Sequence, residues 1–193
     1  MTLKHWTGQT TIGALLALLA ASPASAQKNA VGSSAAPSVL QVSSGSFAAG
    51  QTMPQKLTCD GPDVSPDIQW SSAPVGTQSY VIVMDDPDAP LGFTHWLAYD
   101  IPANTREEPE GASTPSRRLD HAGEGINSFD HAGYGGPCPP EGHPHHYVFH
   151  VYALDVNPGL PAGQSKEQVM AAMQGHVLAQ GQLTGLYARG GGS

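Results

Sequence analysis

The stretch GYGGPCPPEGHPHHYVFHVYALD (Gly133–Asp155) joins a loop of glycine, proline and histidine to a run of alternating polarity. From Tyr147 onward the run is rich in aromatic and β-branched residues, which favour β-strands. Two similar runs precede it, an apolar one at Tyr80–Met84 and a second one, THWLAYDIP, at Thr94–Pro102. The three runs predict the core strands of a β-rich domain.

One helix is predicted near the C-terminus. Ser165 and Gln168 have the spacing of a capping box. Val169, Met173 and Val177 then recur at i, i+4 and i+8, which is the period of a helix face. Gly181 stands where a C-terminal cap belongs, so the helix is expected to run from Ser165 to Gly181.

The N-terminal end has the composition of an export signal. An apolar run, Ile12–Ala21, precedes Ala24 and Ala26 in an A-x-A arrangement, which predicts cleavage of a signal peptide after Ala26. The run is shorter than the roughly 20 residues that span a bilayer core. Small polar residues surround the domain and are typical of flexible segments. The expected organisation is a signal peptide at 1–26, a flexible tether at 27–44, one domain at 45–187 and a flexible tail at 188–193.

The chain is acidic, with a formal net charge of −8, and loss of Lys4 with the signal peptide makes it more negative. Such a chain is not steered towards nucleic acid or anionic lipid surfaces. An exported chain meets oxidising conditions, so Cys59 and Cys138 can form a disulfide. Two separate thiols are equally compatible with the sequence, because it does not show that the two residues meet.

The start of the third strand carries side chains with useful chemistry. Because successive side chains of a strand point to opposite faces, His145 and Tyr147 are expected on one face with Phe149, and His146 on the other. An imidazole and a phenol then point into the same space. Gly135 and Gly136 can expose main-chain N–H groups without a side chain in the way, which suggests an anion cradle.

Several ordered motifs resemble the phosphatidylethanolamine-binding protein (PEBP) family, and most of all its bacterial branch, often called Raf kinase inhibitor-like. They are DPDAP (Asp86–Pro90), the pair His95-Trp96, and GPCPPEG followed by HHYVFHVYALD; LTCDGPDVSPDIQW (Leu57–Trp70) resembles an early signature of that branch. The resemblance covers nearly all of residues 45–187. It implies a mostly β fold, in which a large antiparallel sheet packs with a smaller sheet and peripheral helices. It also implies a small pocket for phosphate-like anions and phospholipid head groups.

The same resemblance implies the pocket residues. Many relatives have His-Arg-Tyr where this chain has His145-His146-Tyr147, so one cation near the mouth is missing or depends on pH. The implied ligand-binding residues are Asp86, His95, His145 and Tyr147, with main-chain contacts from Gly136 and Cys138 and a rim shaped by Asp88 and Pro90.

A carboxylate beside a phosphate needs a physical explanation. Asp86 can hydrogen-bond the second nitrogen of a histidine, which fixes the tautomer of the ring and favours its protonated form. Alternatively, Asp86 can accept the proton of a monoprotonated phosphate oxygen. Neither role requires a covalent step.

Two rival functions remain open at this stage. Six histidines fall within 30 residues of one another, and imidazole binds zinc and copper, so an exported metal-binding protein is one alternative. They are His121, His131, His143, His145, His146 and His150. A hydrolase that uses Asp86 and His145 is the other, although no G-x-S-x-G motif is present and no serine stands out as a nucleophile.

The sequence therefore predicts an exported binding protein, periplasmic or secreted, that is not an enzyme and needs no cofactor. Its expected partner is a phosphate-bearing small molecule or lipid head group, and no nucleic acid. By resemblance, it is also expected to modulate a protein partner such as a protease or kinase. The oligomeric state stays open, a homodimer included.

Overall fold

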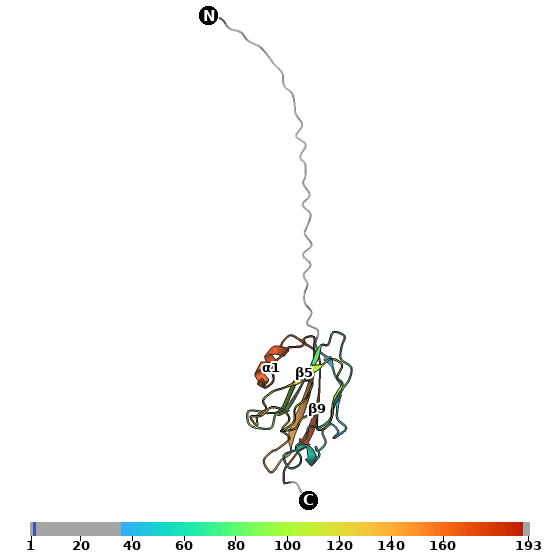
Figure 1. Ribbon diagram of the computed structural model, residues 1–193, viewed down its shortest axis with the longest axis vertical. Coiled ribbons are helices and arrows are strands. Elements are labelled where there is room, and N and C mark those ends of the chain that lie inside the picture. Colours follow the sequence, from blue (N-terminus) through green and yellow to red (C-terminus); the bar gives the residue numbers. More distant parts are fainter. Residues whose placement is uncertain (1, 3–35, 191–193) are drawn as a thin grey trace. The chain divides into compact units, whose positions relative to one another are not determined.

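The computed structural model describes Thr2 and residues 36–190. Residues 36–190 contain two β-sheets and one α-helix (Figure 1). The strands and helices are β1 (Ser38–Val39), β2 (Val42–Ser43), the 3-10 helix η1 (Gln55–Leu57), β3 (Ile68–Trp70), β4 (Ser79–Asp86), β5 (Phe93–Pro102), β6 (Glu107–Glu108), β7 (Gly123–Glu124), β8 (His145–Leu154), α1 (Lys166–Met173) and β9 (Val177–Tyr187).

The expected architecture of a large sheet packed with a smaller one is confirmed. The large sheet has the strand order β1-β9-β8-β4-β5-β7, and the small sheet has the order β2-β3-β6. All neighbouring strands are antiparallel except β1 and β9, which pair in parallel. The large sheet is therefore mixed rather than wholly antiparallel. In the described part of the chain, α1 is the one α-helix beside the sheets.

The three strands predicted from the sequence are the long central strands of the large sheet. Strand β4 lies between β5 and β8, and its residues are almost all buried. Strand β8 alternates as expected, with Tyr147 and Phe149 inside and His146 exposed. The period of two therefore places His145 and Tyr147 on the same face, as predicted.

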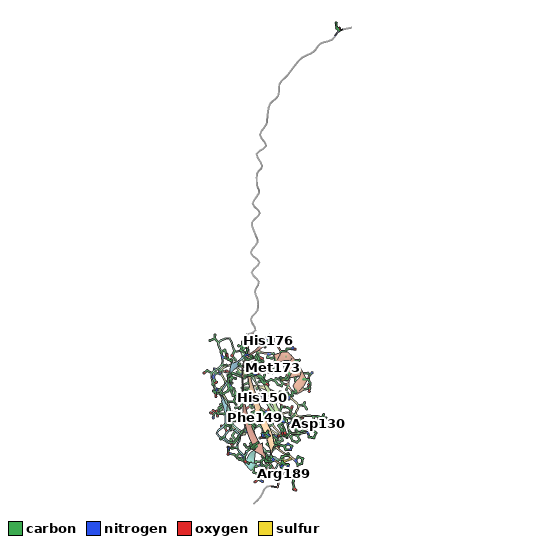
Figure 2. The ribbon with its side chains drawn as sticks, turned by 180° about the vertical axis from the view of Figure 1, so that it is seen from behind. Asp130, Phe149, His150, Met173, His176 and Arg189 are labelled. Atoms are coloured by element: carbon green, nitrogen blue, oxygen red, sulfur yellow. A yellow bond between two sulfur atoms is a disulfide. The ribbon has the colours of Figure 1, made fainter. Side chains whose placement is uncertain are left out.

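Two hydrophobic clusters cover the two faces of the large sheet. The larger cluster includes Phe149 of β8 and fills the space between the two sheets. The smaller cluster packs Val169 and Met173 of α1 against Val81 and Val83 of β4. Figure 2 labels Phe149 and Met173, one from each cluster. Because both faces of β4 are covered, the side chains at its C-terminal end are held by a rigid support.

The C-terminal helix is shorter than predicted. Helix α1 has the expected capping box at Ser165 and Gln168, but it ends at Met173. Gly175 adopts φ +83°, a left-handed conformation that stops the helix. The residues that follow form strand β9 instead of the predicted continuation, so Val177 and Gly181 lie in a strand. A side chain at Gly181 would collide with the main-chain carbonyl of Leu40, which explains the glycine there.

The predicted domain boundaries are also corrected. Strands β1 and β2 lie inside the stretch 27–44 that was expected to be a tether, and Leu40 is buried and donates its N–H to Gln180 O at 2.8 Å. At the other end, Arg189 forms an ion pair with Asp60 at 3.1 Å, so the predicted tail at 188–193 begins too early. The predicted signal peptide and its cleavage site at Ala26 lie outside the described residues. No described helix has the length and apolar character needed to cross a membrane.

Cys59 and Cys138 form a disulfide, with their Cα atoms 5.4 Å apart. Of the two possibilities that the sequence left open, the structure therefore shows the bonded pair. Both cysteines are exposed.

Candidate functional site

A cavity of about 290 Å³ lies where β4 ends, β5 begins and β8 begins. Six of the eight ligand-binding and rim residues expected from the resemblance line it, and the other two, Gly136 and Tyr147, are buried. The lining residues are Asp86, Asp88, Ala89, Pro90, Phe93, His95, Phe129, Cys138, Pro139, Pro140 and His145.

Asp86 and His145 form a fixed pair at the cavity. Asp86 is 3% exposed, and its Oδ1 accepts hydrogen bonds from the N–H groups of Asp88 at 2.9 Å and Ala89 at 3.1 Å. Its Oδ2 lies 2.7 Å from His145 Nδ1. Since an ionised carboxylate can only accept, Nδ1 carries the proton, and Nε2 of His145 is the ring nitrogen left to meet a ligand. This is the first of the two roles expected for Asp86.

His95 lines the cavity but is almost fully buried, and its ring is held by the main chain. Its Nδ1 donates to Gly135 O at 2.7 Å, while Gly135 N–H donates to His95 O at 3.0 Å. Burial lowers the pKa of His95 below its ordinary value, although the carbonyl and Asp86 oppose this shift. The ring is therefore neutral at pH 7, and its Nε2 is an acceptor.

Tyr147 brings a buried hydroxyl group to the same region. Its ring is fully buried and meets the ring of His95 edge-on, with ring centres 5.2 Å apart. Burial raises its pKa well above the usual range, and the negative charges of Asp86 and Asp88 add to this shift, so the hydroxyl stays protonated. Within the described chain this hydroxyl has no hydrogen-bond partner. A buried donor of this kind is costly unless something binds it.

The expected anion cradle of glycine N–H groups is wrong. Gly135 N–H donates to His95 O, and Gly136 N–H donates to the carboxylate of Asp63 at 2.6 Å. Both donors are therefore already used inside the protein. Gly136 instead serves close packing, because a Cβ there would collide with Leu57 O.

Aromatic side chains form one wall of the cavity, and they were not among the site residues predicted from the sequence. Phe93 and Phe129 meet edge-on at 4.7 Å between ring centres, and both contact the ring of His95. Phe93 could have been predicted from the sequence as a lining residue, because it stands two positions before His95 and so shares its face of the strand. Phe129 could not have been predicted in this way, since it lies in a loop and not in a strand.

The histidines do not gather into a metal site. His145 binds Asp86, His146 binds Asp88 at 2.8 Å, and the two rings leave opposite faces of β8. His121 lies elsewhere, 2.9 Å from Glu108. In the part of the chain that the structure describes, no group of three or more His, Cys, Asp or Glu side chains is placed to hold a metal ion. The metal-binding alternative therefore lacks a ligand set among these residues.

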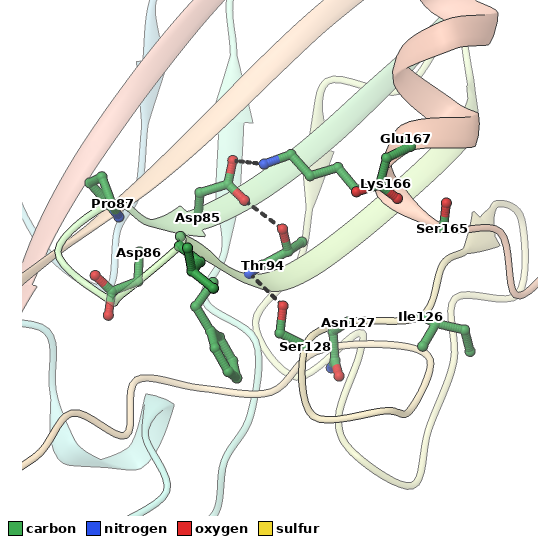
Figure 3. Close-up of a pocket in the computed structure, with 13 residues that line it drawn as sticks. Asp85, Asp86, Pro87, Thr94, Ile126, Asn127, Ser128, Ser165, Lys166 and Glu167 are labelled. Atoms are coloured by element: carbon green, nitrogen blue, oxygen red, sulfur yellow. Dashed lines mark hydrogen bonds and ion pairs between the residues drawn. The ribbon is translucent and has the colours of Figure 1, made fainter.

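A larger hollow of about 560 Å³ lies on the other side of the β4–β5 connection and shares Asp86 and Phe93 with the cavity. Asp85 lines this hollow and accepts hydrogen bonds from Lys166 Nζ at 2.7 Å and from Thr94 Oγ1 at 2.8 Å (Figure 3). Ser128 accepts from Thr94 N–H at 3.0 Å. These polar groups are bonded to one another, so this hollow is less suited to a ligand than the cavity, where the lining residue His95 lies against the ring of Tyr147.

Comparisons with known proteins agree with the motifs. The family model for phosphatidylethanolamine-binding protein matches residues 43–188. A UPF0098 protein of Aquifex aeolicus is 49% identical over 159 residues, which cover 81% of this chain and 92% of the relative. The crystal structure of YbcL of Escherichia coli, a member of the mammalian PEBP family, has a TM-score of 0.72 and 32% identity, and the match covers 77% of this chain and 98% of YbcL.

A PEBP homologue of Chlamydia trachomatis is similar to the same extent, with a TM-score of 0.71 and 34% identity; the match covers 78% of this chain and 98% of the homologue. The matched segments include every element that builds the cavity, from β4 to β8. The chain therefore belongs to the phosphatidylethanolamine-binding protein family.

Proposed function

We propose that the cavity binds a phosphate-bearing small molecule or a phospholipid head group. The observation that carries the proposal is the buried hydroxyl of Tyr147, a donor without a partner among the described residues. His145 adds Nε2, whose direction is fixed by the bond from Nδ1 to Asp86. A phosphate oxygen would satisfy the tyrosine hydroxyl, and the family's name supports this class of ligand.

The charges of the cavity select the protonation state of the ligand. The lining residues include Asp86 and Asp88 but no lysine or arginine. His95 is neutral and presents an acceptor, so a phosphate dianion would meet acceptors and negative charge. A monoprotonated phosphate carries a P–OH donor and less charge, and it fits these partners better. Binding is therefore expected to involve the uptake of one proton.

The rim gives a reason to favour a zwitterionic head group. Asp88 is exposed, and hydrogen bonds from the N–H and the ring of His146 lower the pKa of Asp88, so it stays ionised. An ammonium group attached to the phosphate could pair with this carboxylate or lie over the ring of Phe93 or Phe129. Phosphoethanolamine is the smallest molecule that combines these groups.

A binding role is favoured over catalysis, although Asp86 and His145 have the geometry of a catalytic pair. None of the residues that line the cavity is a serine or threonine, and the thiol of Cys138 is used in the disulfide. We therefore infer a binding protein that acts outside the cytoplasm, where disulfides persist. Modulation of a partner kinase or protease stays part of the proposal.

The test is an NMR titration of the purified protein with phosphoethanolamine, inorganic phosphate and, as a control anion, chloride, all with a chelator present. Saturable shifts at His95, His145 and Tyr147 with phosphoethanolamine or phosphate, and none with chloride, are expected. If no saturable shifts occur up to about 10 mM ligand, a weak limit for a specific site, the proposal is wrong.

A further inference from the structure

The outer wall of the cavity is a loop held by another part of the chain. This wall segment, Gly136–Pro140, contributes Cys138, Pro139 and Pro140 to the lining. The turn at Thr58–Asp63 holds it at three points. Gly136 N–H donates to Asp63 at 2.6 Å, Cys59 N–H donates to Pro137 O at 3.1 Å, and the disulfide joins Cys59 to Cys138.

The disulfide is the attachment nearest to the cavity. Three of the five residues in the wall segment are prolines, which have no N–H to donate. Both hydrogen bonds hold the segment at its start, at Gly136 and Pro137. The next main-chain bond found after Cys138 runs from Gly142 N–H to Arg189 O at 3.5 Å, which is long. The position of Pro139 and Pro140 therefore depends strongly on the bond at Cys138.

The same disulfide is accessible to a reductant. Cys59 and Cys138 are both exposed. An exposed disulfide can be attacked by a thiolate, whereas a buried one is protected. A reagent can therefore reach the disulfide, and breaking it would loosen the segment that lines the cavity at Cys138, Pro139 and Pro140.

We propose that Cys59–Cys138 is a thiol–disulfide exchange site whose redox state sets the affinity of the cavity for its ligand; this rests on the proposed function. The co-reactant is a dithiol. One of its thiolates attacks a sulfur of the disulfide, the S–S bond breaks, and the other cysteine leaves as a thiolate that takes up a proton. The second thiol of the co-reactant then resolves the mixed disulfide. The protein gains two electrons and two protons as free thiols, and the dithiol becomes a disulfide.

The experiment compares binding of phosphoethanolamine by calorimetry to the oxidised protein and to the protein reduced with dithiothreitol, both below the unfolding temperature. Reduction is expected to weaken binding at least fivefold, and reoxidation to restore it. The Met173→Ala variant, oxidised, is the control for general loss of stability, because Met173 packs under α1 in the smaller cluster, away from the cavity. It should bind as tightly as the unmodified protein.

A second variant keeps the test valid if the reduced protein unfolds. Asp63→Gly removes one of the two hydrogen bonds that hold the wall segment while the disulfide stays intact, and glycine tolerates the φ of +57° at this position. It is expected to weaken binding at least threefold. Equal affinity of oxidised and reduced protein overturns the proposal, and so does an unfolded reduced protein combined with full affinity of Asp63→Gly. Absence of binding to the oxidised protein contradicts the proposed function instead.

Discussion

Tyr134 and Tyr147 are both fully buried, but their hydroxyl groups differ: that of Tyr134 donates to Leu57 O at 2.7 Å, and that of Tyr147 meets no partner in the described chain. We expect Tyr147→Phe to weaken phosphoethanolamine binding at least fivefold without lowering the melting temperature, because the lost hydroxyl stabilises only the complex. Calorimetric titration and thermal unfolding measure the two effects.

Tyr134→Phe is the matched control. It leaves Leu57 O buried without its donor, which should cost about 1–3 kcal/mol of unfolding free energy, while binding stays unchanged. If Tyr147→Phe destabilises the free protein as much as Tyr134→Phe and leaves binding intact, its hydroxyl has a structural partner and the assignment fails.

Neighbouring histidines on β8 provide a second comparison. His145→Ala removes the imidazole that Asp86 directs at the cavity, and we expect it to weaken phosphate binding by more than about 1 kcal/mol, or about fivefold. His146→Ala alters an exposed ring on the opposite face and should change the affinity less than twofold. Circular dichroism checks that both variants keep the fold; equal effects of the two substitutions would count against the assignment.

Binding is expected to depend on pH in one direction. His95 has a lowered pKa and is neutral, so the proton that accompanies a bound phosphate resides mainly on the ligand, whose second pKa is about 6. Above that value each pH unit should weaken binding by up to about tenfold for one proton taken up. Affinities for phosphoethanolamine at pH 6, 7 and 8 measure the slope, and a flat profile would contradict proton uptake.

Glu108 predicts a different pH effect, on stability. Its side chain is fully buried, with one oxygen 2.9 Å from His121 and the other without a partner among the described residues. Burial raises the pKa of Glu108, although His121 opposes this shift. The folded protein thus holds the proton more tightly than the unfolded chain does. The free energy of unfolding should fall as the pH rises from the ordinary glutamate pKa through the raised one.

The Glu108→Gln variant removes this titration, so the stability of the unmodified protein relative to the variant should decline from pH 4 to 8 in urea unfolding. Glu110→Gln is the control with the opposite sign. Hydrogen bonds from Lys56 and Ser46 lower the pKa of Glu110, so its contribution is present at high pH and is lost as the pH falls. The same trend for both variants would show that Glu108 does not titrate as inferred.

The sequence predicted the strands whose side chains are apolar or alternate clearly. Strands β4, β5 and β8 were recognised because β-branched and aromatic residues fill them and turns follow them. Strand β9, which also contains Gly185, was missed because Gly181 was interpreted as a helix cap. Both glycines are there because another segment approaches them, Leu40 in one case and Met53 in the other. Such an approach is a tertiary contact that no local pattern reveals.

The candidate site was predictable to the extent that its residues stand in motifs at strand ends. The motifs gave Asp86, His95 and His145, and strand alternation placed Tyr147 on the face of His145. The role of Gly136 was predicted incorrectly, because its N–H is bonded to Asp63, a residue far away in sequence.

The parallel pairing of β1 with β9 joins Ser38 and Val39 to Ala179 and Gln180, close to the two ends of the described domain. Strand β1 is the first of the described strands to be synthesised, and it can pair only after β9, the last of them, has been made. Contacts between residues so distant in sequence make folding slow, because a long loop must close before the contact forms. The large sheet cannot be completed on the ribosome until its C-terminal strand has emerged.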